Sequence, residues 1–175
     1  MELLPCKIDW KKYQAEFPSQ VASWVLPMTT KFPDADLGEM HDSYSQIYEQ
    51  LARHLPQATR KALGLFVAAT SCNSLDSVDF DFFQSTADYD PEEFTEIPQP
   101  HLDPRRMTRV AKALESLEST DYASQVRSAW QKVGAGKMAG LRMESADDFL
   151  DYFALWIRAF KEVRSEGAVL GYIIA

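Results

Sequence analysis

The pattern of apolar and polar residues predicts a helix followed by a strand at the C-terminal end of the chain. From 145 to 167, apolar residues recur every three or four positions, which is typical of one buried helix face. Ser145 and Asp148 have the spacing of a capping box, and Gly167 can adopt the left-handed conformation that ends a helix. The stripe comprises Phe149, Phe153, Trp156, Ile157 and Phe160.

Residues 168–174 are apolar on both faces, which favours a strand in the middle of a sheet over one at its edge. A buried strand needs neighbours, so at least two more strands are expected from earlier in the chain. Residues 78–83 alternate apolar and acidic side chains with a period of two, and 93–99 could form another strand.

Helical spacing recurs along the rest of the chain. Asp9 is predicted to cap one or two short helices that end before Pro27, with Trp24 and Val25 among their apolar positions. The segment 57–70 fits either a helix or a buried strand, and we favour a helix. We expect Gly134 to end a helix and 136–143 to form a loop. Further helices are predicted over 37–55, over 104–117 with Asp103 as cap and Pro104 first, and from Thr120 or Asp121 to Val133.

These elements predict an α+β fold. Five or six helices would pack on a small sheet that includes the C-terminal strand, in one globular domain spanning residues 1–175. No leader-like pattern follows Met1, and no window has the ~20 apolar residues that span a bilayer, so we expect a cytoplasmic protein. Two cysteines, Cys6 and Cys72, are too few for a disulfide framework or a metal knuckle and are expected to be reduced and packed.

The charge of the chain is concentrated in one segment. The net charge is -8, which argues against non-specific binding to nucleic acid or to an anionic membrane. Between Ala62 and Pro104 there are nine acidic residues and no Lys or Arg. The residues before this segment carry a net charge of -1 and those after it +2. The segment therefore accounts for the whole imbalance.

Aromatic residues alternate with these acids, which suggests a binding surface. A solvated loop would explain the acids alone, but Phe and Tyr side chains are costly to leave in water. Aromatic side chains with an acidic rim suit docking onto a basic protein partner, such as a cognate toxin, by an inhibitor or immunity protein. The predicted partner-binding residues are Asp76, Asp79, Phe80, Asp81, Phe83, Asp88, Tyr89, Asp90, Glu92 and Glu93.

No catalytic motif is complete. Gly134–Lys137 lacks the first glycine and the final Ser or Thr of a phosphate-binding loop, and the three histidines lack the spacing of paired metal ligands. Ser71 is not preceded by the glycine elbow that exposes a catalytic serine. We therefore predict no cofactor and no metal. The alternative is a hydrolase or transferase with an unfamiliar site, for which Asp79, Asp81, His101 and Asp103 could hold a metal.

The C-terminal half is similar to a known family. Its features are the helix Met107–Leu117, the acid-opened aromatic helix that begins at Asp147–Phe153, and the ending Glu166–Ile174, which has the sequence EGAVLGYII. Over Leu102–Ala175 the chain resembles the bacterial YfbM-like family, a domain of unknown function. This resemblance implies an α+β fold and no catalytic residues.

Overall fold

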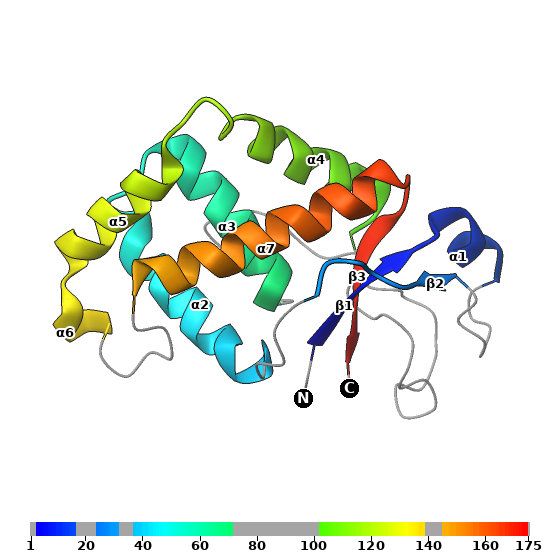
Figure 1. Cartoon of the computed structure of the whole chain (residues 1–175), viewed down its shortest axis with the longest axis horizontal. Helices are drawn as coiled ribbons and strands as arrows, with labels where there is room; N and C mark the ends of the chain where they lie inside the picture. The colour runs from blue at the N-terminus through cyan, green and yellow to red at the C-terminus, as the bar shows by residue number, and fades with distance from the viewer. Residues whose placement is uncertain (1–2, 17–23, 32–36, 72–101, 139–144, 175) are drawn as a thin grey trace. The chain divides into compact units, whose positions relative to one another are not determined.

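The structure is a computed structural model that describes residues 3–16, 24–31, 37–71, 102–138 and 145–174. The fold is α+β, as the sequence predicts: the chain is mostly helical and forms a three-stranded antiparallel sheet that includes the C-terminal strand (Figure 1). Contacts divide the chain into two compact units. The described residues of the first unit are 3–16, 24–31, 37–38, 102–108 and 158–174, and those of the second are 39–71, 109–138 and 145–157. The single domain expected from the sequence stays a prediction.

The first unit contains the sheet, in the order β2-β1-β3 (Figure 1). Strand β1 (Leu3–Ile8) pairs along its whole length with β3 (Val169–Ile174), from Leu3 opposite Ile174 to Ile8 opposite Val169. On its other side β1 pairs only through Lys7 and Ile8, with the two-residue strand β2 (Val25–Leu26). The sheet therefore joins the two ends of the chain, and the two additional strands expected from earlier in the chain are β1 and β2.

Strand β1 is central and was not predicted from the sequence. Its Pro5 cannot donate a backbone hydrogen bond, which argues against a central strand. The N–H of Asp9 donates to the carbonyl of Trp24 at 2.8 Å, so it points towards the β2 side of the strand. Backbone N–H groups point to alternate sides of a strand, so the nitrogen of Pro5, four residues earlier, also points towards β2. Because β2 pairs only with Lys7 and Ile8, Pro5 breaks none of the described ladder bonds.

Strand β3 is expected at the centre of the sheet, and this position stays a prediction because the strands predicted over 78–83 and 93–99 lie outside the described residues. Within the described residues it has β1 on one side only. On the other side, the N–H of Leu102 donates to the carbonyl of Leu170 at 2.8 Å. Ala168, Val169 and Leu170 are buried, as the apolar pattern of this segment predicts.

The first helix, α1 (Trp10–Glu16), begins where predicted, because the Asp9 carboxylate accepts the N–H of Lys12 at 3.2 Å. The prediction that helix extends over Trp24 and Val25 is wrong: Trp24 lies in a turn and Val25 in β2. The pairing of β2 with Lys7 and Ile8 comes from distant sequence, so a helical periodicity in this short stretch could not reveal it.

Helix α7 (Ala146–Ser165) confirms the predicted start and end signals. The N–H of Asp148 donates to Oγ of Ser145, and the N–H of Ser145 donates to Oδ2 of Asp148, both at 3.1 Å. At the other end Gly167 has φ +70°, and Gly167 and Ala168 donate to the carbonyls of Arg164 and Val163 at 3.1 Å. This pair of bonds is a Schellman motif, which turns the chain from α7 into β3.

The second unit is helical, and its helices agree with the predictions except in one short segment. The ambiguous segment 57–70 is a helix, and Asp121 rather than Thr120 caps the helix that Gly134 ends. The expected loop is wrong for residues 136–138, which belong to a four-residue helical turn. The helices are α2 (Leu37–Ala52), α3 (Gln57–Ser71), α4 (Pro104–Glu115, whose first turn lies in the first unit), α5 (Tyr122–Val133) and α6 (Ala135–Met138).

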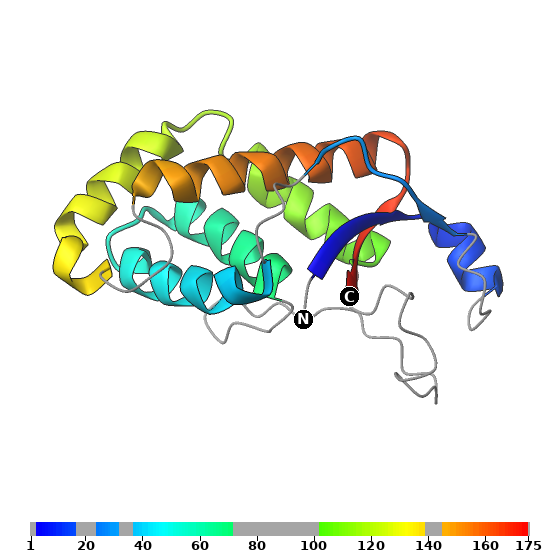
Figure 2. The same ribbon diagram turned by 60° about the horizontal axis from the view of Figure 1, so that its bottom comes forward.

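Aromatic rings form the core of the second unit, where α2 and α3 run side by side in opposite directions (Figure 2). Phe66 of α3 lies at the centre of these rings and is 1% exposed. Its ring centroid lies 5.2 to 5.9 Å from those of Tyr44, Phe149, Phe153 and Trp156. Phe149, Phe153 and Trp156 of the predicted stripe of α7 therefore face this core. Of the other two residues of the stripe, Phe160 is buried in the first unit and Ile157 is half-buried.

Candidate functional site

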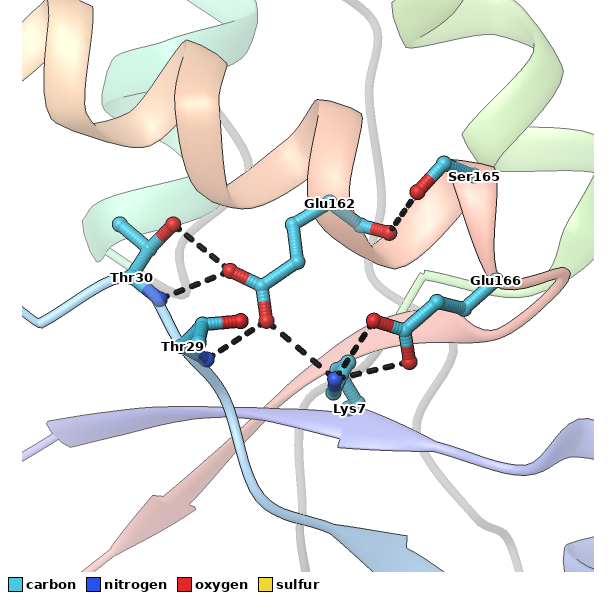
Figure 3. Close-up of polar contacts among 6 residues, drawn as sticks. All are labelled: Lys7, Thr29, Thr30, Glu162, Ser165 and Glu166. Atoms are coloured by element: carbon cyan, nitrogen blue, oxygen red, sulfur yellow. Dashed lines mark hydrogen bonds and ion pairs between the residues drawn. The ribbon is translucent and has the colours of Figure 1, made fainter.

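A connected group of charged and polar side chains surrounds Lys7 and lies entirely in the first unit (Figure 3). Lys7 lies in central strand β1, and its side chain is only 8% exposed. A buried ammonium group needs charged or polar partners, because burial removes its hydration. The contacts of this lysine therefore decide its protonation state and whether it could take part in a reaction.

Two carboxylates meet the Lys7 ammonium group, one from the last turn of α7 and one from the residue that directly follows this helix (Figure 3). Glu162 and Glu166 are four residues apart, which places them on the same face of the helix. Nζ of Lys7 lies 3.2 Å from Oε1 of Glu162 and 2.9 and 2.8 Å from the two carboxylate oxygens of Glu166. The two acids differ in exposure, since the side chain of Glu162 is 13% exposed and that of Glu166 is 46% exposed.

Glu162 also accepts hydrogen bonds from the segment that follows β2 (Figure 3). The N–H groups of Thr29 and Thr30 donate to its two oxygens at 2.7 Å, and the Thr30 hydroxyl donates at 2.7 Å. With Lys7, the carboxylate therefore has four donors, two on each oxygen. This arrangement links the end of α7 to β1 and to the segment after β2.

These contacts keep both groups charged. The hydrogen bond to Glu166 raises the pKa of Lys7, burial lowers it, and the bond to Glu162 raises it again, with a net increase above 10.5. Burial raises the pKa of Glu162, but the hydrogen bonds from Thr29 and Thr30 outweigh burial and hold that pKa well below its usual value of 4.5. Lysine and carboxylate are therefore both ionised at neutral pH.

This cluster is suited to structure rather than to reaction chemistry. A nucleophilic lysine needs a lowered pKa, and a general base needs a pKa near the working pH, whereas both shifts here have the opposite direction. The oxygens of Glu162 are also occupied by donors from the protein itself. The cluster thus cross-links three distant segments of the first unit.

The other candidates from the sequence fall into ordinary structural roles where they are described. Asp103 caps α4, accepting the N–H of Arg106 at 2.7 Å and pairing with its guanidinium at 3.0 Å. Gly134 has φ +82° and donates to the carbonyl of Trp130, as expected of a helix end rather than a phosphate loop. Ser71 is the last residue of α3. Cys6 is a free, buried thiol, and burial raises its pKa to about 12, so it is not a reactive thiolate at neutral pH.

The predicted partner-binding surface lies outside the described residues. All ten of its residues, from Asp76 to Glu93, fall between 72 and 101, as do Cys72 and His101. The strands predicted over 78–83 and 93–99 fall there as well. The prediction of a binding surface in this segment thus stays a prediction.

Within the ranges that the structure describes, no three His, Cys, Asp or Glu side chains are grouped so that they could hold a metal ion. In the same ranges, no helix has the length and apolar character needed to cross a bilayer.

The Lys7 cluster was not predicted from the sequence. One signal was available: Glu162 and Glu166 stand one turn apart near the end of a helix, where acids are unfavourable to the helix dipole. A lysine in the apolar run Leu3–Ile8 was a second signal. Neither signal identifies the partner, because Lys7 and Glu166 are 159 positions apart.

Comparisons with known proteins add no assignment. No family model, no curated protein and no solved structure matches this chain. The resemblance of its C-terminal half to the YfbM-like family therefore stays a prediction.

Proposed function

We propose that this protein is a cytoplasmic protein-binding module of the inhibitor or immunity kind, which occludes a basic partner with its acidic aromatic segment around 76–96. The observation that carries the proposal is the segregation of charge: the stretch from Ala62 to Pro104 holds nine acids and no base in a chain that is otherwise near neutral. The electrostatic field of these acids would attract a basic protein surface over several ångströms and accelerate the association of the two proteins.

The composition of the segment supports a specific contact as well as attraction. Phe80, Phe83 and Tyr89 are side chains of the type that dominates binding energy when buried in a partner's pocket. The carboxylates between them would form the polar rim and reject acidic partners. A basic protein, such as a toxin that acts on nucleic acid or nucleotides, has the complementary surface.

The described residues on either side of the segment belong to folded parts of the chain. On the N-terminal side, α3 ends at Ser71 with Phe66 fixed in the aromatic core of the second unit. On the C-terminal side, Leu102 is fully buried and bonded to the carbonyl of Leu170. The segment is therefore tied at both ends to folded parts of the protein.

The proposal is tested by reversing charge in the segment. Asp79, Asp81, Glu92 and Glu93 are changed together to lysine, and partners are recovered by affinity purification from the native cell, with the product of the neighbouring gene as first candidate. We expect the loss of a basic partner, and we expect wild-type binding to weaken as ionic strength rises.

A matched variant separates the segment from total charge. Lysine is introduced instead at four exposed acids outside it: Glu49, Glu115, Glu118 and Asp151. Both quadruple variants change the net charge by the same amount, from -8 to 0. The proposal requires that only the first variant loses the partner while its circular dichroism spectrum stays that of the wild type. An unchanged set of partners in the first variant would refute it.

A further inference from the structure

We draw no further inference here: the strongest candidate, the outer edge of strand β3 beyond the hydrogen bond between Leu102 and Leu170, has backbone groups suited to strand addition, but nothing in the described part of the chain shows what covers it.

Discussion

Replacing Glu162 by glutamine tests whether the Lys7 cluster holds the first unit together. The substitution keeps the size and shape of the side chain but removes its charge and turns one oxygen into an NH₂ donor. In the wild type, each oxygen accepts two hydrogen bonds: one from Thr29 and Lys7, the other from the N–H and hydroxyl of Thr30. An amide can satisfy only one of these two pairs.

The cost follows from the contacts that are left. In either orientation the new NH₂ group faces a backbone N–H, that of exposed Thr29 or of half-buried Thr30, and leaving such a donor without an acceptor costs at most what a buried donor would cost, about 1–3 kcal/mol. Lys7 also loses its more buried counterion, and removing one partner of a buried pair costs about 3–5 kcal/mol when nothing replaces it. Glu166 remains to compensate part of that charge. We therefore expect Glu162→Gln to lower the free energy of unfolding by about 3 kcal/mol.

The measurement is urea unfolding followed by circular dichroism at neutral pH. A loss of about 3 kcal/mol corresponds to a fall in midpoint of about 1–2 M urea. The matched control is Glu166→Gln, which removes the same charge from the same lysine at a position that is 46% exposed and lacks the threonine donors. A half-exposed ion pair contributes about 0–1 kcal/mol, so this variant should unfold close to the wild type.

A second comparison separates the lysine from the threonine contacts. Lys7→Met removes the ammonium group but leaves Glu162 with its three donors from Thr29 and Thr30, so it should cost less than Glu162→Gln. If the glutamine variants at 162 and 166 unfolded at the same urea concentration, the contacts of Glu162 would not stabilise the first unit as proposed. If Lys7→Met were the most destabilising of the three variants, the threonine contacts of Glu162 would contribute less than the ion pair.

Three further predictions concern pH, the helix end and the last strand. Because the pKa of Glu162 is lowered in the folded protein, its contribution to stability is full above pH 4.5 and is lost as the pH falls further. The difference in free energy of unfolding between wild type and Glu162→Gln, measured by urea titration, should therefore be smaller at about pH 3 than at about pH 7. The raised pKa of Lys7 has the opposite consequence: its contribution is full below pH 10.5 and is lost as the pH rises through the higher folded-state value. Gly167→Ala forces a side chain into the left-handed region at φ +70° and should lower the free energy of unfolding by about 1–2 kcal/mol. The control Gly136→Ala lies in a helical turn with nothing within 4 Å of an added Cβ and should be neutral or slightly stabilising. Equal shifts of the melting temperature in the two variants would contradict this expectation. Ending the chain at Gly167 removes β3 and its six pairings with β1, so we expect the protein to lose its cooperative thermal transition, and a folded, monodisperse product would show that β3 is dispensable.

Much of the helical structure follows from the sequence because its signals are local. A capping box at Ser145 and Asp148, a glycine at 167 and a repeat of apolar side chains lie within one or two turns of the structure they specify. Contacts along a helix face join residues three and four positions apart, so they can be inferred directly from the sequence. The α+β fold class and the boundaries of α3, α4, α5 and α7 were therefore accessible.

The sheet and the Lys7 cluster were decided by tertiary contacts. Strand β1 contains a proline and a lysine, and it is central only because β3, more than 160 positions away, pairs with it and β2 is short enough to leave Pro5 clear. Glu162 looks like an ordinary solvent-facing acid of an amphipathic helix until Thr29 and Thr30 are placed beside it. No local periodicity encodes such meetings, since they depend on how the whole chain closes.

The sequence by itself thus determined where α3, α4, α5 and α7 begin and end and where the charge is concentrated. The tertiary structure alone decided which strand is central and which charges are buried. The physical reason is range: helix signals act between neighbours a few residues apart, whereas strand pairing and the ion pairs of Lys7 join residues from opposite ends of the chain.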